Sequence, residues 1–286
     1  MTYRMAAFRS QALDTLTGGS SAGRDSADFK GLLAELKTPA ATRAAGVDAQ
    51  ADNGLSATGR NLSLFDPESA YRMMSVINHD DVLYKAQYSE MSQMQSYVRD
   101  LQQEVGALGE IGTATADAEI EARLQRFVAQ YNDWDQRFDA DMEGGGLLAD
   151  TQAAQVARYE LKQSIENPFN GAADGLRGLE DLGLTVDPAT GQASLDRSKL
   201  AATLAQNRQG AVHALQEFGA NFAKSAELLN SAGNFIPNRL DNLDRVIHYI
   251  ADNKESLQAE FGLGDPAKPS GLLAQALAAY NRSYGS

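Results

Sequence analysis

The sequence predicts a mainly α-helical protein: an antiparallel helical bundle with coiled-coil character and one small β-hairpin at about residues 182–195. Two patterns carry this prediction. Over three long segments, apolar residues recur at alternating steps of three and four, which is the spacing of helices that pack along one another. One short segment instead alternates apolar and polar residues, which is the spacing of a half-buried strand.

The three apolar seams run over residues 91–108, 120–138 and 240–261, and the third is interrupted by Lys254. Each seam places its apolar residues on one face of a helix. Because one such face cannot be buried alone, the three seams are expected to pack against one another in an antiparallel bundle.

The hairpin prediction rests on apolar residues that alternate with small or polar ones on both sides of a turn. Asp187 and Pro188 supply the turn chemistry, and Gly191 supplies the positive φ that closes it. Asp196 then occupies the N-cap position of a following helix. Since a lone hairpin is only marginally stable in water, this one is expected to pack on the helices.

Shorter helices are predicted between the seams. One is capped by Asp150 or Thr151 and runs to about Glu166, where Asn-Pro stops it. Another covers about residues 210–230, and a break follows at residues 231–237.

Composition divides the chain into three regions. Residues 1–60 are predicted to be a mobile N-terminal arm, because their small and polar residues bury too little surface to offset the entropy of ordering. Within this arm, residues 29–36 are expected to form a transient amphipathic helix. Residues 61–262 are the helical core domain with the hairpin, and residues 263–286 are a proline-broken tail with a short helix at 272–280.

Charge and composition exclude several classes of partner. The formal net charge of −13 argues against nucleic acid and anionic membrane as partners. The absence of cysteine excludes disulfides, thiol nucleophiles and cysteine-based zinc sites. No apolar run approaches the roughly 20 residues of a membrane helix. The first residues lack the continuous apolar segment of a Sec signal peptide, so export by a route that reads the N-terminus stays open.

The metal-competent side chains do not form a predicted site. His79, Asp80 and Asp81 are interpreted as a solvated bend between two helical stretches, not as a divalent-cation site. Adjacent helical residues do not face one another, and no second histidine lies nearby in sequence. His213 and His248 are isolated and are assigned surface or packing roles.

Two loop motifs are interpreted as plain connections. Glu143 followed by glycines 144–146 lacks the Lys-Ser/Thr of a phosphate-binding loop, so a flexible joint between helices is predicted. Residues 187–196 lack the acidic spacing and closing Glu of a calcium loop, so a turn is predicted.

Carboxylates are abundant but suggest no catalytic centre. Asp133, Asp135, Asp139 and Asp141 flank the second seam and are predicted on its solvated face, while Trp134 is predicted in the core. No Ser-His-Asp order or Glu-x-x-His pair has supporting context. We therefore predict no catalytic residue, cofactor-binding residue, metal ligand or cofactor, and no enzyme activity.

Three segments, in order along the chain, resemble the C-terminal region of the FliD-type flagellar filament cap family, also called hook-associated protein 2. Residues 182–200 resemble the family's Leu-Gly-Ile/Leu…Asp…Gly…Leu-Asp-x-x-Lys-Leu signature. Residues 127–133 resemble its Phe-Val-x-x-Tyr-Asn-Asp segment, and residues 146–150 resemble its Gly-x-Leu-x-Gly-Asp segment. A weaker similarity covers residues 84–108, which resemble the family's N-terminal core helix.

The chain also departs from the family pattern. Asn207-Arg208 stands where the family usually has Asn-Pro, and the N-terminal Gly-Leu-x-Ser-Gly-Leu-Asp signature is missing. The variable domains between the core helices are absent, since the seam of residues 120–138 follows almost directly after Leu108. The part that resembles the family is its helical core domain with the hairpin.

The resemblance implies a secreted structural protein of the bacterial flagellum. It implies a filament-cap-like axial component that forms homo-oligomers, or docks on flagellin or hook-junction proteins, and assists filament assembly. Export would follow the flagellar type III route, not Sec, with a flagellar export chaperone as a further partner. The alternative is a cytoplasmic helical interaction module, such as an export chaperone or adaptor, that uses the same seams without being secreted.

Overall fold

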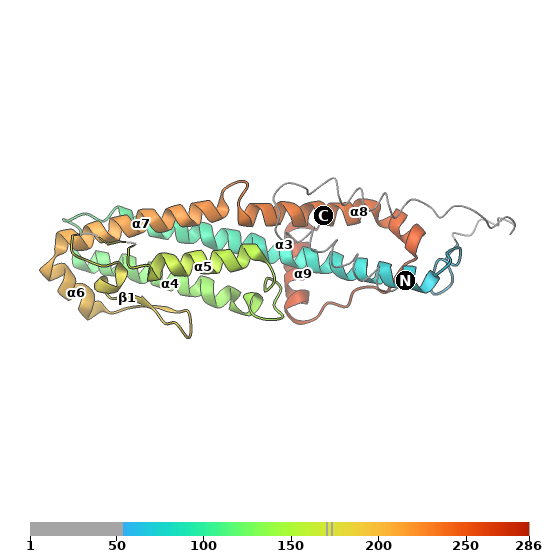
Figure 1. The fold of residues 1–286 in the computed structure, drawn as a ribbon, viewed down its shortest axis with the longest axis horizontal. Coiled ribbons are helices and arrows are strands. Elements are labelled where there is room, and N and C mark those ends of the chain that lie inside the picture. The colour runs from blue at the N-terminus through green and yellow to red at the C-terminus, as the bar shows by residue number, and fades with distance from the viewer. Residues whose placement is uncertain (1–53, 170, 173, 286) are drawn as a thin grey trace. The chain divides into compact units, whose positions relative to one another are not determined.

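The computed structural model describes residues 54–169, 171–172 and 174–285, and this part of the chain is mainly α-helical with one two-stranded antiparallel sheet (Figure 1). The predicted fold class is therefore confirmed. The elements in chain order are α3 (Pro67–Gly109), α4 (Asp117–Met142), α5 (Gln152–Glu166), the 3-10 helix η1 (Leu179–Leu182), β1 (Leu184–Val186), β2 (Ala193–Leu195), α6 (Arg197–Gln206), α7 (Arg208–Asn230), α8 (Phe235–Phe261) and α9 (Gly271–Tyr284).

The chain forms two compact units. Unit 2 comprises residues 87–240, and unit 1 comprises the described residues up to Ala86 together with those from Asp241 onward. The division falls inside α3 and inside α8, so each of these helices contributes residues to both units. It differs from the predicted boundaries after residues 60 and 262, because composition does not register a division within a continuous helix.

The predicted N-terminal arm lies outside the described residues as far as residue 53, and so does the helix predicted at residues 29–36. The rest of that predicted arm belongs to unit 1. Leu55 pairs with Asn61 in an isolated antiparallel bridge. The folded segment that leads into α3 therefore begins before the predicted boundary.

In unit 2, α3 and α4 run antiparallel. Arg123, near the start of α4, donates from Nη1 to the carbonyl of Ala107 near the end of α3 (2.6 Å). Arg137, near the end of α4, donates to Glu90 much earlier in α3 (2.5 Å). Partners that descend along one helix as they ascend along the other define an antiparallel pair.

The helices α7 and α5 continue this antiparallel arrangement. Gln216 of α7 donates to the carbonyl of Ile111, and Asn230 at the end of α7 donates to that of Gln95 in α3 (2.6 and 3.0 Å). This order makes α7 antiparallel to α3. The α5 contacts with α4 are also in reverse order, as in the ion pair between Arg158 and Asp139 (2.9 Å).

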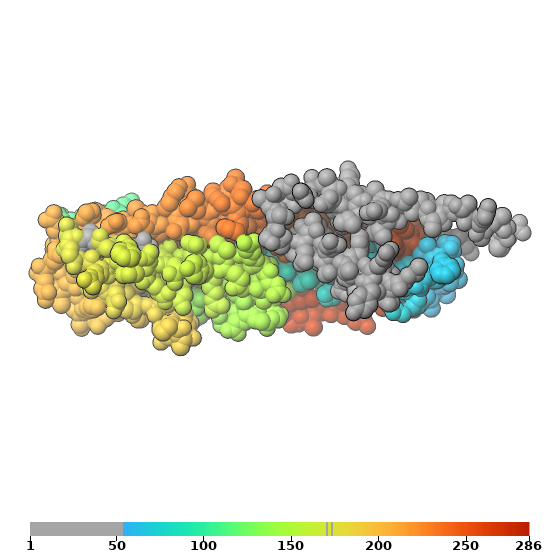
Figure 2. Space-filling view, viewed as in Figure 1, coloured from blue at the N-terminus to red at the C-terminus, as the bar shows by residue number. Residues whose placement is uncertain are grey.

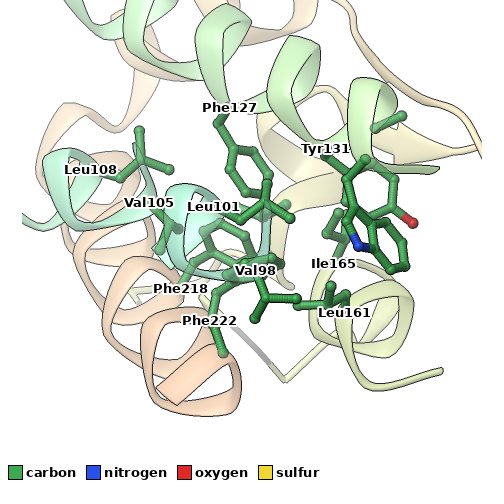
Figure 3. Close-up of a cluster of buried hydrophobic side chains, with 14 of the residues drawn as sticks. Val98, Leu101, Val105, Leu108, Phe127, Tyr131, Leu161, Ile165, Phe218 and Phe222 are labelled. Atoms are coloured by element: carbon green, nitrogen blue, oxygen red, sulfur yellow. The ribbon is translucent and has the colours of Figure 1, made fainter. Parts of the chain in front are cut away.

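The first two predicted seams form the core of unit 2, and their apolar positions are buried. Phe127 contacts two rings of α7 edge to face, with centroids 5.4 Å from Phe218 and 5.2 Å from Phe222. Trp134 is buried, as predicted. Figure 3 labels Val98, Leu101, Val105 and Leu108 of α3, Phe127 and Tyr131 of α4, Leu161 and Ile165 of α5, and Phe218 and Phe222 of α7.

The third seam does not complete this core. Its residues Leu243, Ile247 and Leu257 are buried but belong to unit 1, and Leu240 alone of the seam's leucines belongs to unit 2. The remaining sides of unit 2 are covered by α5 and α7, which carry apolar faces of their own. The expectation that the three seams bury one another therefore holds for the first two.

The hairpin prediction is confirmed, although its strands are short. Leu184 pairs with Leu195 and Val186 with Ala193. Leu182 belongs to η1 and not to the strand, because Gly183 follows in the left-handed region at φ 85° and ends the 3-10 turn.

The cap predicted for the next helix is also confirmed. Oδ1 of Asp196 accepts the backbone N–H groups of Ser198 and Lys199 at 2.9 and 3.0 Å. These bonds satisfy two of the donors that the first turn of α6 leaves without an intrahelical partner.

One predicted cap and one predicted helix boundary differ from the structure. Thr151 occupies the N-cap position of α5, but its hydroxyl donates to the Leu148 carbonyl (2.7 Å) and makes no capping bond. The predicted break at residues 231–237 ends earlier, because α8 begins at Phe235 and includes Pro237. A proline is tolerated in the first helical turn, where its missing N–H has no intrahelical acceptor.

Unit 1 is fastened by asparagine side chains. Asn61 donates from Nδ2 to the carbonyls of Ala259 and Glu260 at the end of α8 (2.9 and 3.1 Å). Asn78 of α3 donates to the carbonyls of Leu263 and Asp265 (both 3.0 Å). Backbone acceptors at the end of α8 and just beyond it are thereby satisfied.

Replacing Phe127 by Asp is expected to unfold unit 2, because burying an unpaired carboxylate among aromatic rings costs several kcal/mol, on the order of the stability of a domain. The fluorescence of Trp134, the chain's one tryptophan, checks this. Ala129→Asp is the control, because Ala129 is exposed on the same helix. If Phe127→Asp unfolded at the wild-type denaturant concentration, the assignment of the seam would be wrong.

Candidate functional site

The segment His79-Asp80-Asp81 was predicted to be a bend, but in the structure it is part of α3. Polar residues do not by themselves interrupt a helix, and the apolar pattern resumes directly afterward. Only His79 of the three is exposed, whereas Asp80 and Asp81 are half-buried. His79 Nδ1 lies 3.3 Å from Asp80 Oδ1, and Asp81 pairs with Lys85 at 2.7 Å. Among the described residues, no three histidine or acidic side chains gather to hold a metal ion.

The other two histidines lie on helix surfaces. His213 Nδ1 is 3.2 Å from Asp174 Oδ2, and His248 Nδ1 is 3.3 Å from Asp244 Oδ1. Both imidazoles are largely exposed, and their contacts are surface ion pairs of small energetic weight.

The triple glycine connects α4 to α5, as predicted, and packing requires its last member. A Cβ on Gly146 would lie 2.3 Å from the carbonyl oxygen of Ala140 and 2.4 Å from that of Asp141. The N–H of Leu148 donates to the same Asp141 carbonyl at 2.8 Å. This end of the connection is thus packed tightly on the last turn of α4.

Residues 187–192 form a turn closed by its own first side chain, while the rest of the predicted turn, up to residue 195, is strand β2. Oδ1 of Asp187 accepts the N–H groups of Ala189 and Thr190 at 2.7 and 3.0 Å. The hydrogen bonds from Thr190 and Ala189 lower the pKa of the Asp187 carboxyl, because they stabilise its ionised form.

The prediction that the α4 carboxylates lie on a solvated face is wrong for two of the four. Asp133 is exposed and Asp139 half-buried, but Asp135 and Asp141 are only 4% and 2% exposed. Other elements cover these two positions: the hairpin lies beside Asp135, and Arg137 and α3 lie beside Asp141. A single-helix pattern cannot anticipate such neighbours.

Asn132 fixes the hairpin to α4. Its amide group donates from Nδ2 to the Ala193 carbonyl (2.9 Å), and its Oδ1 accepts the Ala193 N–H (2.7 Å). One side chain therefore satisfies both backbone groups of a buried strand residue. The hairpin, yellow in Figure 2, forms one continuous packed surface with the green helices α4 and α5.

Asp135 reinforces this contact one turn further along α4. Its Oδ2 accepts a hydrogen bond from Gln192 Nε2 at 3.0 Å. Burial raises the pKa of the Asp135 carboxyl, and the charge of Arg158 opposes that effect. The hairpin thus contacts α4 through a polar surface built from a single helical face.

A second polar group lies between α3 and α4. Arg137 donates to Glu90 at 2.5 Å, to Asp141 at 3.1 Å and to Gln93 at 2.8 Å. Burial is the main cause that raises the pKa of the Glu90 carboxyl.

Sequence reasoning named neither Asn132 nor the group around Arg137 as important. Asn132 had one usable signal, its place in the Tyr-Asn-Asp segment of the family resemblance. Arg137 and Asp141 had one weak signal, the i, i+4 spacing of a helical ion pair. Glu90 had none, because Arg137 lies 47 positions away along the chain.

Large exposed apolar side chains are the described groups best suited to bind a partner. Phe65 is fully exposed just before α3, and Leu62 is exposed three residues earlier. The others are Tyr159, Phe169, Leu228, Phe235, Leu263, Leu272 and Tyr284.

Comparison with protein-family models, curated proteins and solved structures finds no match to this chain. Among the described helices, none is both long and apolar enough to cross a membrane.

Replacing Asn132 by Ala is expected to lower the free energy of unfolding of unit 2 by about 2 kcal/mol, because both backbone groups of Ala193 lose their partners in a buried site. Denaturant unfolding followed by Trp134 fluorescence measures the loss. Gln136→Ala is the control, since the Gln136 contact with Gln192 is exposed to solvent. Equal effects of the two variants would show that Asn132 does not hold the hairpin.

Gly146→Ala is expected to destabilise unit 2 by more than about 1 kcal/mol, because the added methyl group meets backbone oxygens that cannot move aside. Gly144→Ala is the matched control: its Cβ would meet no atom within 4 Å. The midpoints of thermal unfolding compare the two. If both variants melted together, the connection would be a loose joint.

Proposed function

We propose that this protein is a structural axial component of the bacterial flagellum, similar to a filament cap. In this role it is secreted, has no enzymatic activity, and associates with copies of itself or with flagellin or hook-junction proteins. The chain would act through helical faces and exposed apolar side chains, with no bound cofactor.

The observation that carries the proposal is the contact between Asn132 and Ala193. Asn132 belongs to the Tyr-Asn-Asp segment and Ala193 to the hairpin signature, two of the three segments that resemble the cap family. Segments 61 positions apart in sequence meet through two hydrogen bonds. A shared structural role explains why both segments would occur in one chain.

The third similar segment fits the same arrangement. Residues 146–150 form the connection between α4 and α5, and packing on α4 requires the glycine at its start. All three segments therefore belong to unit 2 and contact α4 or lead out of it.

The exposed side chains support a role in assembly. Phe65 and Leu62 in unit 1 expose apolar surface that a monomer in water gains nothing by exposing. An axial subunit would bury such surface against a neighbouring subunit. The net charge of −13 keeps the free chain soluble before assembly.

A cytoplasmic export chaperone or adaptor is the alternative, and secretion distinguishes it from the axial role. We expect the chain in the culture supernatant and in sheared flagella of a flagellated bacterium, and only when the flagellar export gate is functional. A strain whose gate is inactivated, with the chain expressed at the same level, is the control. Retention in the cytosol bound to a partner, with the gate intact, would contradict the proposal.

A further inference from the structure

Glu90 and Asp141 place two carboxyl groups beside one guanidinium inside unit 2. Arg137 contacts both, at 2.5 and 3.1 Å. Glu90 is 5% exposed and Asp141 2% exposed, so water screens their charges weakly. If both carboxyls were ionised, two negative charges would be buried against one positive charge, which is costly.

One oxygen of this group lacks a donor. Oδ1 of Asp141 is buried and accepts no hydrogen bond within the part of the chain that the structure describes. The guanidinium of Arg137 nevertheless brings the two carboxyl groups side by side, because adjacent nitrogens of it bond Glu90 (2.5 Å) and Asp141 (3.1 Å). Two ionised carboxylates cannot bond, because neither has a proton to donate. A proton on Glu90 would supply the missing donor.

We infer that Glu90 keeps a proton in folded unit 2 and donates it to Asp141, and that this hydrogen bond locks α3 to α4 around Arg137. With the proton in place, one carboxylate charge balances one guanidinium charge, and the two carboxyls are bonded to each other. The inference concerns the folded unit alone and does not depend on the proposed function.

The surroundings of the lock are polar and mixed in charge. Gln93 accepts from Arg137, and Gln87, one turn before Glu90 on α3, accepts from Arg239 of α8 at 2.6 Å. Tyr97 of α3 packs its ring on Phe138 of α4, close to Asp133 and Arg137.

The lock has a defined response to pH. Burial first, and then the charge of Asp141, raises the pKa of Glu90 above its ordinary value of 4.5, while Arg137 opposes both. At a pH above that ordinary value, Glu90 has released its proton in the unfolded chain but keeps it in the folded chain. The stabilisation is therefore complete at lower pH and is lost as pH rises through the raised pKa of the folded state.

Glu90→Gln tests the inference, because the glutamine amide donates to Asp141 and its carbonyl oxygen accepts from Arg137, as a protonated Glu90 would. The unfolding constants of the full wild-type chain and of the variant are compared above pH 4.5. The wild-type constant should rise more steeply with pH, by up to about an additional tenfold per pH unit. Trp134 fluorescence follows unit 2 in both. Glu104→Gln is the control, since Glu104 pairs with Arg126 nearer the surface and should leave the pH dependence unchanged.

The double variant provides a second readout. Glu90→Gln and Asp141→Asn each leave one carboxylate opposite Arg137, so each should unfold at pH 8 no more readily than the wild type. Together they leave the half-buried guanidinium of Arg137 without a carboxylate, and the unfolding constant should exceed the product of the single effects by about tenfold.

Either of two results would overturn the inference: a wild-type pH dependence in Glu90→Gln, or single effects that simply multiply in the double variant. If Glu90→Gln fails to fold, Asp141→Asn carries the same pH test, because its amide offers the complementary donor to Glu90.

Discussion

Burial of α4 on several sides is the constraint on which the rest of unit 2 depends. The helix contacts α7 through Phe127, α3 through Arg137, and strand β2 through Asn132. The apolar seam of α4 alone cannot pack against all three neighbours, because α3 and β2 present polar groups that need hydrogen-bond partners. The helix therefore combines an apolar stripe with polar side chains that are buried and hydrogen-bonded. Each partner element is positioned by its contact with this one helix, so α4 sets the arrangement of the others.

The polar contacts of α4 differ in kind. Asn132 is neutral and satisfies both backbone groups of Ala193, which gives the hairpin one register on the helix. Arg137 is charged and lies half-buried between two buried carboxyls, and burying charge contributes little net stability even when the charges are paired. Its contribution is to specify how α3 and α4 align. The apolar seam supplies most of the free energy of unit 2, and these polar side chains select one arrangement of its parts.

Local patterns predicted the fold where a single element decides the outcome. The seam through Phe127, the hairpin turn at Gly191 and the cap at Asp196 each follow from the residues within one turn or strand. Predictions from the sequence were wrong where an element far away along the chain determines the surroundings of a residue. Asp141 was expected in solvent because nothing in its own helix indicates that α3 brings Glu90 to the same Arg137 guanidinium. Pro237 was expected to lie in a break, although the first turn of a helix accepts proline. The family resemblance included Asn132 in a matching segment, but its role required the contact with Ala193.

We expect the hairpin and α4 to open as one cooperative body, because Asn132 holds both backbone groups of Ala193. Native-state hydrogen exchange on the full chain measures this, because the Ala193 amide bonds to an α4 side chain and reports their separation. The Ala193 amide should exchange with the same opening free energy as the core amides of Phe127 and Phe218. If Ala193 exchanged through a much less costly opening while those two amides stayed protected, the hairpin would separate from α4 independently.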